Sequence, residues 1–241
     1  DFDLRVTPSS VTAKPGSSVP ITVYALRKDG FNDDIALELE NAPKGFALSG
    51  AWVPGGQDMV RLTLSVPPEP AKEPFLLQLY GHTLIQGRRI LRPAFPADEM
   101  MQAFIYQHIV PTKDWAVFVT GGAAPKLPCT SVDKGLRIPI NGTGQARFLV
   151  DQGTDARNLR FELSEPPKGI SLQEPVAVER GVVVPIKCEP DKVKAGQKGN
   201  LLFVLSQERS FLSKTDKKLV TSKWVMGMLP AIPFEIASGK R

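Results

Sequence analysis

The feature that most constrains the fold is a repeat, in which a segment of the first half of the chain recurs in the second. The segment IALELENAPKGFALSG begins at Ile35, and it matches LRFELSEPPKGISLQE, which begins at Leu159. The offset of 124 residues also places Pro43 on Pro167. A match at this spacing is typical of a domain that occurs twice, so we expect two copies of one fold.

The repeated segment has the alternation of a half-buried β-strand. Ile35, Leu37 and Leu39 alternate with small or polar residues, and the copy at 159–163 has the same pattern. A period of two predicts one face in the core and one in water. The Pro-Lys-Gly that follows ends the strand, because proline has no N–H to donate and glycine accepts the backbone of a tight turn.

The same offset relates the next strand, since VRLTLSV and VVVPIKC keep their apolar residues at matching positions. A slip of one residue would turn those side chains outward, so shared parity indicates a shared fold. Phe148 and Val150 fit the repeat only if the following loop differs by one residue. PAFP at Pro93 and PAIP at Pro230 lie 137 apart, which indicates about 13 additional residues in the second copy. We place them in SQERSFLSKTDKK, interpreted as a long hairpin loop.

Each copy contains about seven short alternating segments separated by turn signals, and the chain has 20 Gly and 22 Pro to supply those turns. We therefore predict an all-β protein of two tandem immunoglobulin-like antiparallel β-sandwiches, residues 1–97 and 112–241. The chain lacks the paired cysteines and core tryptophan of antibody domains, so the likeness is to the broad architecture.

The segment between the copies, 98–111, has a different pattern. Met100 and Phe104, then Met101 and Ile105, are four residues apart, as along one face of a helix. Asp98 can cap such a helix and Pro111 prevents its continuation. We predict a short helical linker that packs between the sandwiches, with an interdomain joint formed by Met100, Met101, Phe104, Ile105 and His108.

Several stretches together resemble a known group of proteins: VTPSSVTAKPGSSVPITVYALRKDGF, GFALSGAWVPGGQDMVRLTLSVPP, IQGRRILRPAFPADEMMQAFIYQHIVP and LPAIPFEI. They are similar to the C-terminal region of large secreted bacterial proteins that contain pre-peptidase C-terminal-like domains. The resemblance implies export and a multidomain parent protein. It assigns no functional residue, because no motif in these stretches has an assigned role.

Charge and hydropathy bear on partners. The chain carries a net charge of +5, with −2 up to Pro111 and +7 beyond it. The basic half could face an acidic partner, but its lysines lie in turns without interleaved aromatics, so we favour a solvated face and expect no nucleic acid. No apolar run reaches the roughly 18 residues that span a bilayer. Because the chain opens with Asp1, we expect a processed protein or a piece of a longer one.

The motifs of catalysis and metal binding are missing. A Ser or Cys nucleophile needs a base, and the chain has only His82 and His108; we place His82 at a strand end or in a hairpin turn. No HExxH or CxxC pattern occurs. The acidic loop 29–34 could bind calcium, but its spacing fits no known calcium loop and we favour a plain turn. Cys129 and Cys188 could form a disulfide or remain free, and spacing does not decide between them.

Trp52 is the one candidate ligand contact. It lies in SGAWVPGGQ, beside Gly and Pro, where an exposed ring could hold a glycan, although packing between strands is the alternative that we favour. We therefore expect a non-catalytic structural or interaction module and, as the resemblance implies, one that belongs to a large exported bacterial protein, periplasmic, extracellular or at the cell surface. The alternative is a carbohydrate-binding or adhesive module. We expect no cofactor and no metal, and as partners we expect other domains of the same polypeptide, cell-surface proteins or a glycan.

Overall fold

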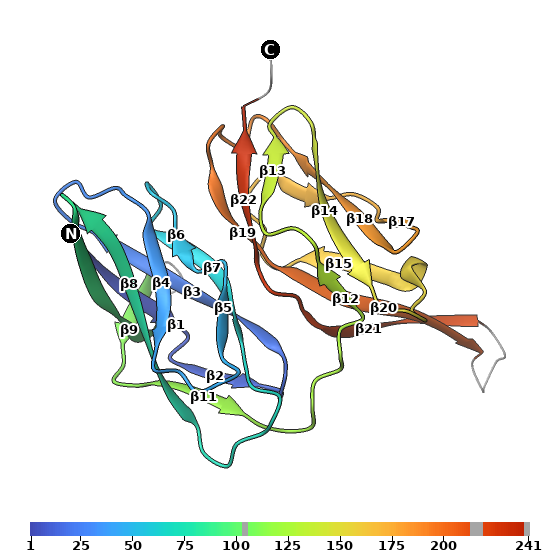
Figure 1. The fold of residues 1–241 in the computed structure, drawn as a ribbon, viewed down its shortest axis with the longest axis horizontal. Helices are drawn as coiled ribbons and strands as arrows, with labels where there is room; N and C mark the ends of the chain where they lie inside the picture. The colour runs from blue at the N-terminus through green and yellow to red at the C-terminus, as the bar shows by residue number, and fades with distance from the viewer. Residues whose placement is uncertain (103–105, 213–218, 239–241) are drawn as a thin grey trace. The chain divides into compact units, whose positions relative to one another are not determined.

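The computed structural model describes residues 1–102, 106–212 and 219–238, and it is all-β. The chain divides into two compact units, Asp1–Ala124 and Pro125–Arg241 (Figure 1). In the described ranges the only helical element is a single 3₁₀ turn, η1 (Ala156–Asn158). The described part of the chain contains no apolar helix of membrane-spanning length.

The first unit is built around one long, folded sheet. Its order is β2-β11-β8-β9-β1-β3-β7-β5, with β4 beside β8, β6 beside β4, and β10 beside β9. The strands are β1 (Phe2–Thr7), β2 (Ser10–Ala13), β3 (Ser18–Arg27), β4 (Ile35–Glu40), β5 (Ala47–Ser49), β6 (Trp52–Val53), β7 (Met59–Ser65), β8 (Phe75–Ile85), β9 (Arg88–Gln102), β10 (Tyr106–Pro111) and β11 (Trp115–Val119).

This sheet closes over a single hydrophobic core. Inward residues of β1, β3 and β7 share that core with those of β4, β8 and β11. Gly81 on β8 faces this core tightly, because an added Cβ would lie 2.4 Å from Leu4 Cδ1 and 2.8 Å from Ile35 Cγ2. A larger residue could not occupy this position without displacing core side chains.

The second unit contains three smaller sheets, ordered β12-β14-β18-β16, β13-β22-β19 and β15-β20-β21, with β17 paired to β18. They surround a separate core. The strands are β12 (Cys129–Ser131), β13 (Leu136–Pro139), β14 (Thr143–Val150), β15 (Leu159–Leu163), β16 (Ile170–Leu172), β17 (Val176–Val178), β18 (Gly181–Cys188), β19 (Lys198–Leu201), β20 (Phe203–Leu212), β21 (Leu219–Met228) and β22 (Ile232–Ala237).

Strand pairing bears out the repeat. In the first unit Leu39 pairs with Leu79, and at the offset of 124 Leu163 pairs with Phe203. The pair β3 and β7 corresponds to β14 and β18 with a shift of one residue, because Phe148 and Ala146 face the core. This is the one-residue loop difference that the sequence required. Of the stretch 206–218, the described residues 206–212 belong to β20, which pairs with β21 as a strand and is not a loop; residues 213–218 lie outside the described residues.

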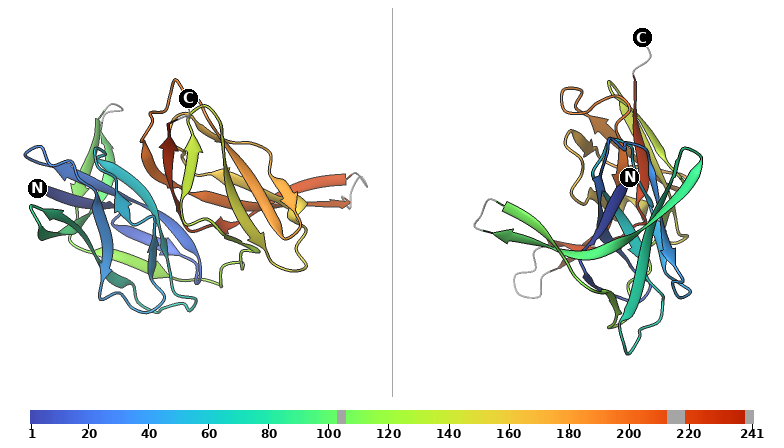
Figure 2. Two further views of the ribbon diagram at one scale, coloured as in Figure 1. Left: turned by 45° about the horizontal axis from the view of Figure 1, so that its top comes forward. Right: turned by 90° about the vertical axis from the view of Figure 1, so that its left-hand side faces the viewer.

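The prediction of a helix at 98–111 is wrong, because the described residues of this segment form a β-hairpin. β9 is already extended when it reaches Ala97, since it pairs with β8 up to Ala94 and with β1 as far as Pro96. It then pairs with β10, with Met100 opposite His108. Non-local pairing therefore overrides the four-residue spacing. Figure 2 shows this hairpin, which we call the β9–β10 arm (97–102 and 106–111), extending away from the body of the first unit.

The strand at Trp115–Val119 also differs from the expected domain plan. It was assigned to the second sandwich, but β11 pairs with β2 and β8 of the first unit, and Trp115, Val117 and Val119 are buried in the first core. The units divide after Ala124. β22 pairs with β13 and β19 in the way that β11 pairs with β2 and β8, so β11 is the last strand of its copy.

Candidate functional site

The outward side of β4, β8 and the first half of β9, together with Trp52, forms a continuous surface that we call the outer face. Cross-strand partners place their side chains on the same side of a sheet. Trp52 is opposite Ala36, Ala36 is opposite His82, and His82 is opposite Leu91. These four residues therefore form one row across four strands.

The next row adds polar groups. Tyr80 lies between Glu38 on β4 and Pro93 on β9. Arg89 Nη2 donates to Glu38 Oε1 at 2.7 Å, and His82 Nδ1 lies 3.7 Å from the same oxygen. The charge of Glu40, with a hydrogen bond from the phenol, raises the pKa of Tyr80 above its ordinary value. Glu38, Arg89 and Tyr80 thus place a carboxylate, a guanidinium and a phenol beside the half-buried rings of Trp52 and His82.

Large apolar side chains on this surface are exposed. Their exposed fractions are 64% for Leu76, 67% for Leu84, 42% for Leu91 and 51% for Phe95. Isolated exposed apolar residues are ordinary, but Leu84 and Leu91 are diagonal neighbours on β8 and β9, and neighbouring exposed apolar residues mark an interaction surface. The outer face combines such residues with ordered polar groups.

A cleft of about 280 Å³ opens on the same unit, where β9 leaves β8 to pair with β1 and β11 takes its place. Divergence of the two strands leaves this hollow unfilled. Tyr80 and Phe95 line it together with Lys113 and Asp114 from the turn before β11. The cleft extends the outer face toward the turn before β11, which carries the positive charge of Lys113 and the negative charge of Asp114.

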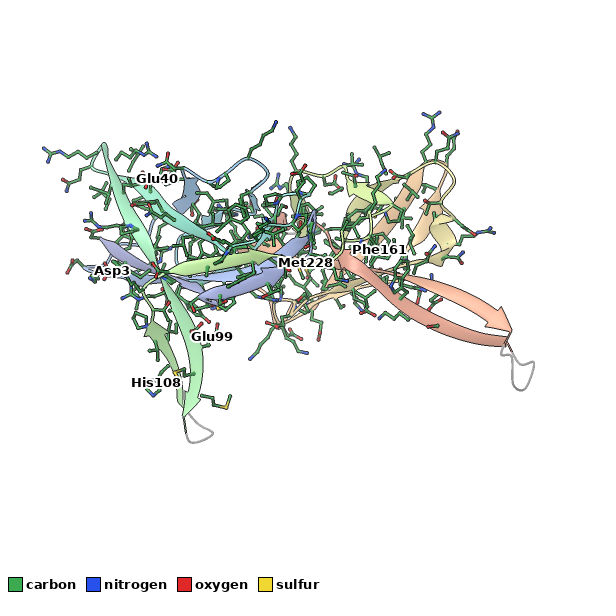
Figure 3. The ribbon with its side chains drawn as sticks, turned by 90° about the horizontal axis from the view of Figure 1, so that it is seen from below. Asp3, Glu40, Glu99, His108, Phe161 and Met228 are labelled. Atoms are coloured by element: carbon green, nitrogen blue, oxygen red, sulfur yellow. The ribbon has the colours of Figure 1, made fainter. Side chains whose placement is uncertain are left out.

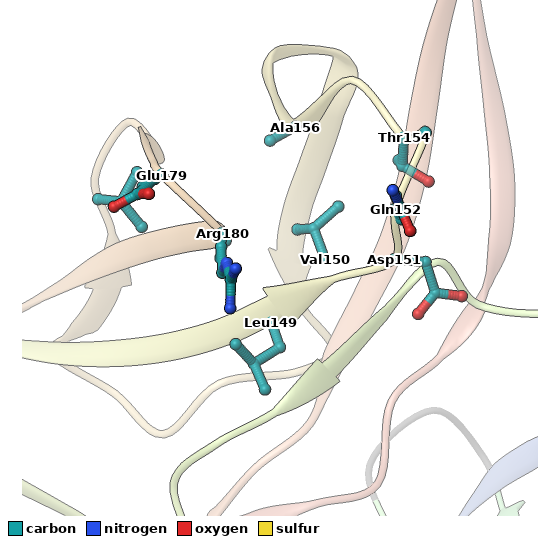
Figure 4. A pocket seen from close by; sticks show the side chains of 11 residues that line it. Leu149, Val150, Asp151, Gln152, Thr154, Ala156, Glu179 and Arg180 are labelled. Carbon is teal, nitrogen blue, oxygen red and sulfur yellow. The ribbon is translucent and has the colours of Figure 1, made fainter.

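A larger cleft, of about 590 Å³, lies in the second unit between the 151–156 loop and the β17–β18 turn (Figure 4). Its apolar wall includes Leu149 and Val178, which are 57% and 50% exposed. Asp151 on its rim pairs with Lys126 at 2.7 Å. Among the described residues the Arg180 guanidinium has no ion-pair or hydrogen-bond partner. The cleft is wide open and offers a single unpaired cation, so its geometry does not indicate which ligand it would bind.

The structure separates the residues that the sequence proposed. Trp52 begins β6 and is half-buried on the outer face. Met100 and Met101 lie on the β9–β10 arm with exposed fractions of 55% and 68%, and His108 is exposed on β10. Phe104 and Ile105 lie outside the described residues. The arm is part of the first unit, so Met100, Met101 and His108 share a hairpin instead of a helical linker.

His82 is the residue whose surroundings the sequence missed. It lies near the end of strand β8, which ends at Ile85, and its neighbours come from strands β4 and β9. A signal for the outer face was present in FLLQLYGHTLI, where apolar residues such as Leu76 and Leu84 occupy outward as well as inward positions.

The acidic loop 29–34 is organised by an arginine. The Arg27 guanidinium donates to the carbonyl oxygens of Asp33, Pro54 and Gln57 at 2.8–3.0 Å. Asp34 Oδ1 accepts from the N–H of Gly55 at 2.6 Å. The loop thus has a structural role as a turn. No group of three or more His, Cys, Asp or Glu side chains in the described ranges is arranged to hold a metal ion.

The fold decides the state of the cysteines, which are both free and buried. Cys129 is opposite Val150 on β14. The Val150 N–H donates to the carbonyl oxygen of Arg180, just before β18 begins, so Cys129 lies near the start of β18. Cys188 is the last residue of the same strand. Eight residues of extended chain correspond to about 26 Å, and a disulfide needs Cα atoms within about 7 Å. The bridge that spacing left undecided cannot form in this fold.

Comparison with protein-family models and with curated protein sequences found no match. The functional reading therefore depends on the surfaces described above.

Proposed function

We propose that this chain is a non-catalytic interaction module of an exported bacterial protein, built from two immunoglobulin-like β-sandwiches. Each unit encloses its own core between layers of mostly antiparallel strands, with β11 parallel to β2 and β22 parallel to β13, which supports the sandwich assignment. The sequence resemblance supports export and membership of a larger protein. A sandwich hosts many functions, so the surface has to carry the argument.

The observation that carries the proposal is the exposed apolar cluster on the outer face. Leu84 and Leu91 lie beside the Arg89–Glu38 ion pair, and apolar residues bordered by ordered charges are typical of a protein-binding patch. A catalytic reading has less support. His82 contacts Glu38, but its cross-strand neighbours Ala36 and Leu91 supply no nucleophile.

Removal of the apolar cluster tests this function. We expect a partner from a native cell-surface extract to be retained by the wild-type protein and lost by the double variant Leu84→Ser and Leu91→Ser, measured by quantitative mass spectrometry. Leu26→Ser is the matched control, because Leu26 is 45% exposed on β3, away from this face. The same retained proteins for the wild type and the double variant would contradict the proposal.

A second candidate, carbohydrate binding, is favoured by the row that contains Trp52. The small Ala36 separates the Trp52 and His82 rings, while Glu38 and Arg89 provide groups that can hydrogen-bond to sugar hydroxyls. A panel of soluble polysaccharides followed by tryptophan fluorescence tests it. We expect Trp52→Ala to abolish the response and Trp224→Ala, in the second unit, to retain it. A response of Trp52→Ala equal to that of the wild type would eliminate this candidate.

A further inference from the structure

The β9–β10 arm is an insertion in the first unit. β22 begins at Ile232, soon after β21 ends at Met228, whereas the chain between Ala94, where β9 leaves β8, and β11 at Trp115 forms the arm. The second unit completes its core without such a hairpin. Beyond Ala97, no described residue of the arm is buried in the first core, so the arm is not needed for the sandwich.

The base of the arm is nevertheless fixed. Asp98 accepts hydrogen bonds from the N–H and Oγ of Ser9, at 3.0 and 2.9 Å. Glu99 Oε1 accepts from Thr7 Oγ1 at 3.0 Å and from the Tyr24 hydroxyl at 2.8 Å. Figure 3 shows Glu99 near the point where the ribbon leaves the body, and His108 farther out. The anchored base presents the two strands at a defined position.

The outer edge of β10 has open backbone groups. Thr112 N donates to Pro96 O at 2.8 Å in the register that pairs β10 with β9. Since hydrogen-bonded pairs alternate in an antiparallel ladder, the N–H groups of His108 and Val110 point toward β9. Those of Gln107 and Ile109 point away from it, and β10 pairs only with β9 in the described residues.

The other strand edges in the described residues are shorter than β10 or carry charges. β6 has two residues, β5, β12, β16 and β17 have three each, and β2 has four. Among the others, Arg137 lies on β13 and Lys223 on β21. β10 has six residues, YQHIVP, with no Lys, Arg, Asp or Glu. Short length, charge and proline are the usual means of blocking strand addition; β10 is neither short nor charged, and its one proline, Pro111, is its last residue.

We infer that the open edge of β10 accepts an extended segment of a partner protein as an added strand. Main-chain groups would supply hydrogen bonds, and the apolar Met100, Met101 and Val110 would receive alternate side chains. The arm contains Asp98 and Glu99, both at its base, but no Lys or Arg, so the complementary segment is apolar with a basic end beside that base. This inference rests on the proposed interaction function but uses a different surface.

A second copy of the chain fits this edge less well than a foreign segment. Symmetric pairing of two β10 strands would join six residues from each copy. A stable dimer interface needs roughly 20–30 residues a side. A short peptide does not have to hold two whole proteins together, so an edge of this length suits it better.

The test uses the whole chain and a synthetic seven-residue peptide of alternating valine and threonine with a lysine at each end. We expect the peptide to slow hydrogen exchange at the Gln107 and Ile109 amides. Ile109→Pro removes one outward N–H and should weaken binding by about tenfold, the effect of one lost hydrogen bond to a buried partner. Ile109→Thr keeps the N–H and should bind like the wild type.

The design separates the outcomes. Protection of the His108 and Val110 amides reports whether the arm is intact in Ile109→Pro, and Gln107→Pro, which removes the other outward amide, is the second variant. Equal binding by the wild type and both proline variants would overturn the inference. So would equal binding of the same peptide with glutamate ends, or a wild-type dimer in sedimentation that Ile109→Pro abolishes. If the peptide does not bind the edge of β10, the test of the proposed function with the Leu84 and Leu91 variant is unaffected, because that test uses the outer face.

Discussion

The glycine of the repeated Pro-Lys-Gly turn is fixed by two constraints. Gly45 and Gly169 have φ of 101° and 83°, a region that side chains disfavour. A Cβ on Gly45 would also lie 2.9 Å from Pro67 Cα, and one on Gly169 would lie 2.7 Å from Lys192 Cβ. The turn therefore packs against the chain after the next strand pair in both units, which explains why it persists in both copies.

Gly45→Ala should destabilise the first unit by about 2–4 kcal/mol, because backbone strain and overpacking add. Gly30→Ala is the control, since Gly30 has φ of 74° but nothing within 4 Å of an added Cβ. It should lose only about 1 kcal/mol. The free energy of unfolding in urea measures both, and equal losses would show that the Pro67 contact contributes nothing.

The thiols should be inert in the folded protein. Burial, and then the charge of Asp151, raises the pKa of Cys129 to about 12, and burial raises the pKa of Cys188. A raised thiol pKa means that folding favours the neutral form, so this stability is present below the ordinary pKa and is lost as pH rises through the folded value. At mildly alkaline pH we expect no reaction with a disulfide reagent in the native state and two reactive thiols in denaturant. Reaction of either thiol without unfolding would contradict this prediction.

At the scale of elements, Asp98, which was expected to cap a helix, instead secures a hairpin together with Glu99. Asp98→Ala removes both hydrogen bonds to Ser9, so we expect faster hydrogen exchange along the arm. The core should be nearly unaffected, in contrast to the loss of about 2–5 kcal/mol for truncating a buried leucine such as Leu62. Glu73→Ala, which removes an exposed carboxylate elsewhere in the unit, is the control. Unchanged exchange in Asp98→Ala would show that the arm needs no anchor.

Local residue patterns were sufficient to predict most strands. The features that they did not predict depend on pairing between strands that are distant in the sequence. Alternation at Ile35, Leu37 and Leu39 fixed both strand and inward face, because a period of two needs no knowledge of the partner. The arm was misassigned because Met100 and Met101 satisfy a helical spacing, and only pairing with β1 and β8 makes the segment extended. The sequence did not predict the outer face for the same reason, because Trp52 and His82 are distant in the sequence and become neighbours only when both of their strands pair with β4.

At the scale of the whole molecule, the domain boundary has a direct consequence. A fragment 1–124 should fold, because it contains the complete first core, and 125–241 should fold as well. A fragment 1–111, which ends where the linker was expected to end, lacks Trp115, Val117 and Val119. Burial of such side chains contributes about 1.5–3 kcal/mol each, so this fragment should lose most of its stability. Circular dichroism and urea unfolding measure this, and equal stability of 1–111 and 1–124 would refute it.

The last strand of each unit runs parallel to a strand near the start of the unit, with Val117 beside Val11 and Ile236 beside Ile138. When the two chain ends are pulled apart, the two parallel strands are sheared in opposite directions along their length. Their evenly spaced hydrogen bonds then bear the load at the same time. We expect a higher rupture force from the ends than between Lys28 and Asp58, beside the adjacent ends of antiparallel β3 and β7, in single-molecule pulling. With no disulfide to limit extension, each unit would hold under load and, once ruptured, release its full contour length.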